Sequence, residues 1–231
     1  MAPTTIQVLC AGAAKHAFTR VIAKFEQDTG NRVHCQFAAV GTLLERYRSG
    51  SAADLLVLNW PVLEQLAAEG KVDAPPRELG TVGVGIAVPR GANRPDLSSA
   101  GALREALLRA DSLSYGDPEK GDSSGVHFAK VLRQLGIEEA VAGKTRLAPA
   151  GLAVAEMVRD GVVAMGATQA SVIAACEGVV LAGLLPTEVQ HLTTYACGTV
   201  CNAGAAEAAR ELARFLGSRF AAEVFGQSGF S

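Results

Sequence analysis

The chain has 231 residues, of which 49% are hydrophobic and 19% are charged, and its formal net charge at pH 7 is −2. This composition is typical of a globular protein with a sizeable core, and it excludes a disordered chain. The charge gives no electrostatic reason to expect a nucleic acid or an acidic membrane as partner, so a small molecule is the favoured ligand.

The N-terminal segment MAPTTIQVLC lacks the basic region and the long apolar region of a secretory signal. No apolar run approaches the roughly 20 residues of a membrane-spanning helix, so we expect no membrane insertion. Two locations stay open at this point. The protein is periplasmic if an export signal has been trimmed from the chain, and cytoplasmic if the chain is native as given.

Strands and helices alternate regularly through the first third of the chain. After a strand at 5–11, apolar side chains recur at i, i+3, i+4 and i+7 and form one helix face, which Gly30 ends. The elements that follow are strands at 32–38 and 53–59 and helices at 42–50 and 61–70. This order predicts a parallel sheet with helices on both faces. The ligand site of such a sheet lies at the carboxyl ends of its strands, here residues 10–14, 37–42 and 58–60.

A long strand and a Pro/Gly/Asn cluster at 80–97 predict a crossover into a second lobe. The second lobe again alternates, with helices expected at 101–110, 124–136, 152–161 and 170–178 and strands at 112–117, 144–149, 162–168 and 179–185. An extended segment at 189–200 leads to one final amphipathic helix at 205–229. We therefore predict an α/β fold of two lobes, each a mostly parallel sheet flanked by helices. Lobe 1 is residues 1–81 plus 197–231, lobe 2 is 82–196, and two extended crossovers leave a ligand cleft between them.

The five cysteines are odd in number and match no metal-site spacing. Cys10 and Cys35 occupy matching places in the first two strands, and we expect buried free thiols rather than a disulfide; a reactive Cys10 at the strand end is the alternative. His34, His127 and His191 lie apart in the sequence. We predict no metal and no cofactor.

Several phrases of the chain together resemble one family of proteins. They are IQVLCAGAAKHAF, FAAVGTLLERYRSGSAADLLVLN, GDPEKGDSSGVHFAKVLRQLG, RLAPAGLAVAEMVRDGVVAMGAT and FLGSRFAAEVFGQSGF. Their succession resembles the two-domain, type 2 periplasmic solute-binding proteins, and most closely the molybdate-binding group. The resemblance implies a ligand clamped between two lobes by helix N-termini, hinge closure around it, and a transporter permease of the ABC class as partner.

The resemblance also places the ligand contacts. First-lobe contacts fall at Ala13 and around Ala39 to Gly41, and second-lobe contacts fall near Ser124, Ala153 and Gln169. The molybdate binders have serine hydroxyls at the first-lobe positions and a tyrosine in place of Gln169. Each hydrogen bond lost to a buried charged ligand costs about 1.5–3 kcal/mol, so we expect molybdate to be disfavoured. An organic di- or tricarboxylate is the favoured small anion.

Two charged or titratable residues stand at the start of the first helix. Lys15 opposes the helix dipole there, so it is either a solvated surface lysine or a cation that pairs with a ligand carboxylate. His16 lies about 200° from Phe18 around the helix, away from the apolar face, and is either a surface residue or a base.

The remaining candidates are mostly residues at strand ends or helix starts. Ala14, Gly41 and Thr42 belong to the first lobe, whereas Tyr115, Ser123 and Ser124 belong to the second. Ser123 or Ser124 as the N-cap of its helix is the plain alternative to a ligand contact. Arg46 is expected to be a surface residue or a partner of Glu45 or Asp54.

Two principal functions follow. The first is a solute-binding protein that captures a small carboxylate. The second is an isomerase on the same scaffold, because bacterial aconitate isomerase is similar to this binding-protein group. In that case Lys15 and His16 are the catalytic candidates for an allylic proton shift on a tricarboxylate. A sensor without a transporter ranks third.

Overall fold

The computed structural model describes residues 3–231, and the contacts among them divide the chain into two compact units. Unit 1 comprises the residues up to Val82 together with Thr193–Ser231, and unit 2 comprises Gly83–Leu192. The chain enters unit 2 within strand β4 (Arg77–Pro89) and leaves it at the start of β9 (Leu192–Thr199).

The sheet of unit 1 is built around β1 (Thr5–Ala11), which lies between β2 (Arg32–Ala38) and β3 (Leu55–Asn59) and runs parallel to both. Strand β9 continues the sheet beyond β3 and is antiparallel to it. The first four residues of β3 are buried, as expected for an apolar strand that helices cover on both faces.

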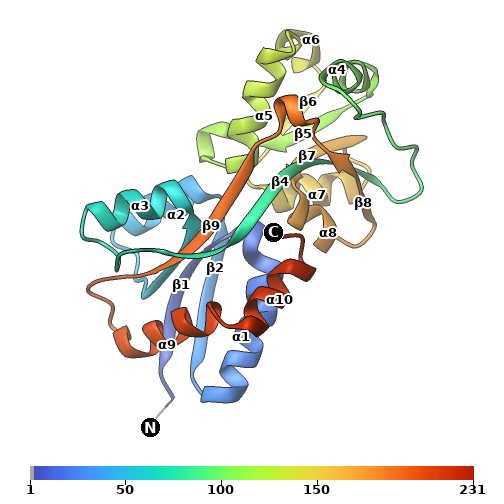
Figure 1. The fold of residues 1–231 in the computed structure, drawn as a ribbon. Helices are drawn as coiled ribbons and strands as arrows, with labels where there is room; N and C mark the ends of the chain where they lie inside the picture. Colours follow the sequence, from blue (N-terminus) through green and yellow to red (C-terminus); the bar gives the residue numbers. More distant parts are fainter. Residues whose placement is uncertain (1–2) are drawn as a thin grey trace. The chain divides into compact units, whose positions relative to one another are not determined.

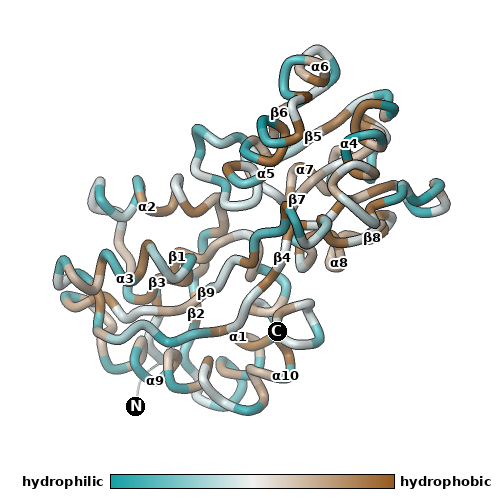
Figure 2. Tube along the Cα trace, turned by 45° about the horizontal axis from the view of Figure 1, so that its top comes forward, coloured by the Kyte–Doolittle hydropathy of each residue, from teal (hydrophilic) through white to brown (hydrophobic). Residues whose placement is uncertain are grey.

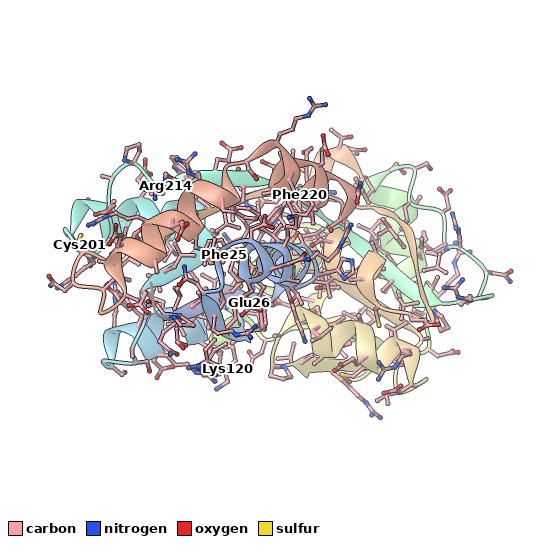
Figure 3. All side chains as sticks on the ribbon, turned by 90° about the horizontal axis from the view of Figure 1, so that it is seen from below. Phe25, Glu26, Lys120, Cys201, Arg214 and Phe220 are labelled. Carbon is pink, nitrogen blue, oxygen red and sulfur yellow. The ribbon has the colours of Figure 1, made fainter. Side chains whose placement is uncertain are left out.

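Among the described residues of unit 1, six helical segments occur. They are η1 (Gly12–Ala14), α1 (Lys15–Thr29), α2 (Val40–Arg48), α3 (Trp60–Ala68), α9 (Ala206–Leu216) and α10 (Arg219–Gln227). Helices α1, α9 and α10 pack together on one face of the sheet, and α2 and α3 lie on the other (Figure 1). Phe25 of α1 lies against α9 (Figure 3), where its ring meets Phe215 edge to face at 5.5 Å between centroids.

The C-terminal segment differs from the single helix expected at 205–229. Helix α9 ends at Leu216, and α10 begins at Arg219. Gly217 ends the first helix, and the Ser218 hydroxyl accepts a hydrogen bond from the Ala221 N–H at 3.2 Å. The Ser218 cap starts a new helix. Because both helices are amphipathic, the apolar pattern continues across the break and did not reveal it.

Unit 2 repeats the strand arrangement of unit 1. Strand β5 (Leu113–Gly116) lies between β6 (Thr145–Ala148) and β7 (Met165–Gln169), and all three are parallel. Strand β4 pairs antiparallel with β7, as β9 does with β3 in unit 1, and β8 (Val179–Leu184) pairs with β4.

The helical segments of unit 2 are α4 (Ala100–Arg109), η2 (Pro118–Lys120), α5 (Ser123–Gln134), α6 (Glu138–Ala142), α7 (Gly151–Arg159), α8 (Ala170–Ala175) and η3 (Thr187–Val189). Apolar residues of α4, α5 and α6 pack with β4, β5 and β7 in one core. Hydrophobic and hydrophilic residues alternate along the helices in Figure 2, as expected for helices with one buried face. Among residues 3–231, no helix has the length and apolar composition that crossing a membrane requires.

A buried carboxylate connects β1 to the segment before α9. Asp54 is 5% exposed; its Oδ2 accepts from the Gln7 N–H at 2.8 Å, and its Oδ1 accepts from the Ala205 N–H at 2.9 Å. We predict that Asp54→Asn lowers the free energy of unfolding by about 2 kcal/mol, because the new amide turns a donor toward one of these N–H groups. Urea denaturation measures the change. Asp28→Asn, at an exposed ion pair with Lys24, is the matched control, and an equal loss there contradicts the assignment.

Candidate functional site

The helix starts of unit 1 gather at one edge of its sheet. Segment η1 with α1, helix α2 and helix α3 begin directly after β1, β2 and β3, which are parallel neighbours. We call residues 12–15, 39–42 and 59–60 the unit-1 edge. Within the described chain, none of these helices has an N-cap side chain that bonds to its first turn. No side chain therefore caps the helix starts at this edge, and uncapped helix starts are sites where anions bind.

Lys15 is exposed, and its Nζ lies 5.6 Å from the centroid of the Phe37 ring. That distance is within the range of a cation–π contact, which holds the side chain over β2 without neutralising it. His16 is also exposed. Neither residue forms an ion pair within the described part of the chain.

The other predicted residues of unit 1 differ in accessibility. Ala13, Gly41 and Thr42 are half-buried, whereas Ala14 is buried. Arg46 is exposed, which agrees with the expectation of a surface residue, and it does not pair with the alternative partners Glu45 or Asp54. Its Nη1 donates to Gln36 Oε1 at 3.1 Å, because that residue lies on the neighbouring strand β2.

Asn59 is a polar residue of this edge that the candidate set omitted. It is the N-cap of α3, yet its side chain makes no capping bond. Its Oδ1 is buried and has no hydrogen-bond partner within residues 3–231. The signal was present in the sequence, because Asn59 ends the third strand at the edge where the ligand site of a parallel sheet lies.

In unit 2, a carboxylate of the protein occupies the corresponding helix starts. Asp122 is 7% exposed and is the N-cap of α5. Its Oδ1 accepts from Ser124 Oγ at 2.6 Å and from the Gly125 N–H at 2.8 Å, and its Oδ2 accepts from the Gly151 N–H at 3.0 Å, at the start of α7. The N-cap is therefore neither Ser123 nor Ser124, and the Ser124 hydroxyl donates to the protein.

Glycines make this arrangement possible. A Cβ at Gly125 would overlap the Gly116 carbonyl oxygen, and one at Gly116 would overlap the Asp122 carboxylate. Helix α5 therefore starts in direct backbone contact with the end of β5. The start of α5 is held against the sheet by close packing as well as by the hydrogen bonds of Asp122.

The other candidates of unit 2 have different surroundings. Ser123 begins α5, and its Oγ is buried without a hydrogen bond in the described residues, while Ala153 is half-buried in α7. Gln169 is the buried N-cap of α8. Tyr115 belongs to the apolar core, where its ring packs against Phe128 at 5.4 Å between centroids, and burial raises the pKa of its hydroxyl. This position favours packing over ligand binding.

The cysteines of the first two strands are free thiols. Cys10 is buried and Cys35 is half-buried. Burial raises the pKa of Cys10, which keeps its thiol protonated and unreactive.

Two of the histidines that are distant in sequence lie close together in the structure. The ring centroids of His127 and His191 are 5.2 Å apart. No group of three or more metal-binding side chains occurs within the described residues.

A comparison with known families gives the identity of this fold. Residues 6–231 match the family described as "Bacterial extracellular solute-binding protein". The chain belongs to this family. Among its relatives, it is 30% identical over 233 residues to an aconitate isomerase of a Pseudomonas species, a match that covers 98% of this chain and 87% of that protein.

Solved structures confirm the predicted two-lobed α/β fold and its resemblance to the molybdate-binding group. The periplasmic molybdate-binding protein of Azotobacter vinelandii has a TM-score of 0.82 and 13% identity, covering 98% of each chain. The sulfate-binding protein SubI of Mycobacterium tuberculosis has a TM-score of 0.75 and 16% identity, covering 98% of this chain and 86% of that one. At such identities the likeness shows the fold alone.

Two helical glycines provide a matched test of the packing at α5. We predict that Gly125→Ala lowers the free energy of unfolding by about 3 kcal/mol or more, because α5 must move away from β5. At Gly101, in the first turn of α4, the nearest side-chain atom to a new Cβ is Ser99 Oγ at 3.8 Å, so Gly101→Ala is expected to be neutral or up to about 1 kcal/mol more stable. Urea denaturation of both variants measures the difference. Equal stability of the two contradicts the packing argument.

Proposed function

We propose that this solute-binding family member binds a small organic di- or tricarboxylate. The observation that carries the proposal is the unit-1 edge, where three uncapped helix starts lie beside the unneutralised ammonium of Lys15. Backbone N–H groups and a cation are the groups that bind carboxylate oxygens.

The side chains at these positions favour a carboxylate over molybdate. The positions that carry serine hydroxyls in the molybdate-binding group are Ala13 and the run from Ala39 to Gly41. In unit 2, the Ser124 hydroxyl donates to Asp122. A compact oxyanion such as molybdate would therefore lack these hydroxyl donors in unit 1. The Ser124 hydroxyl already donates its hydrogen bond to Asp122. A carboxylate ligand that reaches Lys15 replaces some of these contacts with an ion pair.

The proposed setting follows from the family. As a binding protein, the chain acts in the periplasm and delivers its ligand to an ABC transporter permease. The match to a family described as extracellular supports this location. A molybdate-binding protein and a sulfate-binding protein share the fold, so the fold is compatible with a small anion as ligand.

Calorimetric titration with succinate, citrate, trans-aconitate, molybdate and sulfate tests the ligand class. We predict that at least one carboxylate binds saturably and raises the melting temperature, since a ligand at 100 times its Kd stabilises the fold by about 2.7 kcal/mol. Lys15→Gln is expected to weaken that binding about tenfold or more, through loss of a charged contact. Lys24→Gln, farther along the same helix, is the control. Saturable binding of molybdate with no binding of any carboxylate disproves the proposal.

An isomerase is the second candidate function. The observation in its favour is the 30% identity to an aconitate isomerase over 98% of this chain. Interconversion of trans- and cis-aconitate removes a proton from the CH₂ carbon, shifts the double bond, and adds a proton at the former vinyl carbon, so no other reactant is needed. Lys15 is positioned to hold a carboxylate, and His16, in the same helical turn, is the candidate to move the proton.

Incubation with trans-aconitate, followed by proton NMR, tests this activity. If the chain is an isomerase, cis-aconitate accumulates, and His16→Gln slows turnover about 100-fold or more while the affinity for trans-aconitate changes little. His34→Gln, at an exposed histidine that hydrogen-bonds Gln7, is the control. If trans-aconitate binds but is not converted to cis-aconitate at high protein concentration, the isomerase function is rejected and the binding function is retained.

A further inference from the structure

A second cationic feature of unit 1 lies away from the unit-1 edge. A cavity of about 220 Å³ is lined by Arg77, Arg210, Arg214, Asp73, Cys197 and Thr199, among others, and we call it the arginine pocket. Thr199 pairs with Leu55, the first residue of β3, whereas the unit-1 edge includes Asn59, at the last residue of that strand. The arginine pocket therefore lies at the opposite end of β3 from the proposed carboxylate site.

We propose that the arginine pocket is a second anion site, which binds a small dianion that carries a phosphate group. Its three guanidinium groups come from two elements. Arg210 and Arg214 are four residues apart on α9, so they share one face of the helix, and Arg77 comes from the start of β4. Figure 3 shows Arg214 on α9. Arg77 lies across Gly217, where any Cβ would overlap its side chain.

The charges of the arginine pocket are not balanced by the protein. Arg210 Nε lies 3.4 Å from Asp73 Oδ2. Within the described residues, Arg77 and Arg214 have neither an ion pair nor a hydrogen bond from their guanidinium groups. Three arginines against one aspartate leave a formal charge of +2 in a chain whose net charge is −2. The C-terminal end of α9 contributes about half a negative charge, which does not cancel this excess.

The floor of the arginine pocket offers a neutral donor. Thr199 is 4% exposed, and no hydrogen bond in the described chain uses its hydroxyl. Cys197, two residues earlier on the same face of β9, is 1% exposed, and burial raises the pKa of its thiol to about 12. The thiol is therefore uncharged at neutral pH and adds no repulsion toward an anion.

The arrangement of donors selects the ligand class. Guanidinium groups bind pairs of oxygens through two parallel hydrogen bonds. A phosphate group presents three oxygens in different directions, which suits cations that approach from a strand and from a helix. A single carboxylate presents two oxygens in one plane. A cavity of about 220 Å³ has room for phosphate with a small substituent.

Titration of the full chain with inorganic phosphate, followed by ¹H–¹⁵N NMR, tests the site. We expect saturable shifts at Thr199, Arg210 and Arg214. Arg77→Gln with Arg214→Gln is expected to raise the Kd for phosphate about tenfold or more, through the loss of two charge-assisted contacts. The control combines Arg48→Gln and Arg219→Gln, which remove the same charge elsewhere in unit 1 and should leave the Kd nearly unchanged.

Each alternative outcome overturns part or all of the inference. If both double variants weaken phosphate binding equally, phosphate is attracted by the overall charge and not by this pocket. If the folded protein shows no saturable NMR shifts, the site is rejected. Tighter binding of succinate than of phosphate at the same residues assigns the pocket to dicarboxylates and overturns the phosphate assignment. Arg214→Gln alone provides a milder variant if the double substitution unfolds. Binding of trans-aconitate at the unit-1 edge is measured separately, so failure here leaves the proposed function intact.

Discussion

The central constraint on this protein is the strand order of its two sheets. In each unit, the first of three parallel strands lies between the two strands that follow it in the sequence. Strand β1 lies between β2 and β3, and β5 lies between β6 and β7, with all pairs parallel. Short connections then bring three helix starts to one edge of each sheet, because each helix must begin where its strand ends. The strand order that buries the apolar strands therefore also brings the N-terminal ends of several helix dipoles to that edge. This effect comes from the backbone and does not depend on the side chains.

The two units use this edge differently. In unit 1 the helix starts are uncapped and stand beside Lys15, whereas in unit 2 the carboxylate of Asp122 bonds to the starts of both α5 and α7. A buried carboxylate without a cation is stable there because a hydroxyl and two backbone N–H groups satisfy it. Its charge also opposes a second anion nearby. The helix starts of unit 1 therefore leave room for an external anion, whereas those of α5 and α7 in unit 2 already bind a carboxylate of the protein.

Much of the fold could be predicted from the sequence, because apolar periodicity reports burial and both units repeat strand, helix and turn signals. The break between α9 and α10 could not, since a helical pattern continues across Gly217 and Ser218. Among site residues, the sequence predicts which residues end a strand, but it does not determine the direction of their side chains. Tyr115 ends up in the core because its side chain points to the α5 face of the sheet. Asp122 was missed because its role depends on contact with α7, which is distant in sequence.

Electrostatics also explains why a nearly neutral composition conceals two cationic regions. Most ion pairs within the described residues are exposed and join residues close in sequence, such as Arg219 with Glu223 and Arg159 with Asp160. Such pairs contribute little to stability. Lys15, Arg77 and Arg214 are among the cations that form no ion pair in the described residues, and they are informative because each lies at a candidate anion site. Net charge averages over paired and unpaired cations, so it does not reveal where a small anion binds. For such a ligand, the position of individual unpaired cations matters: Lys15 lies at one end of the unit-1 sheet, and Arg77 and Arg214 lie at the other.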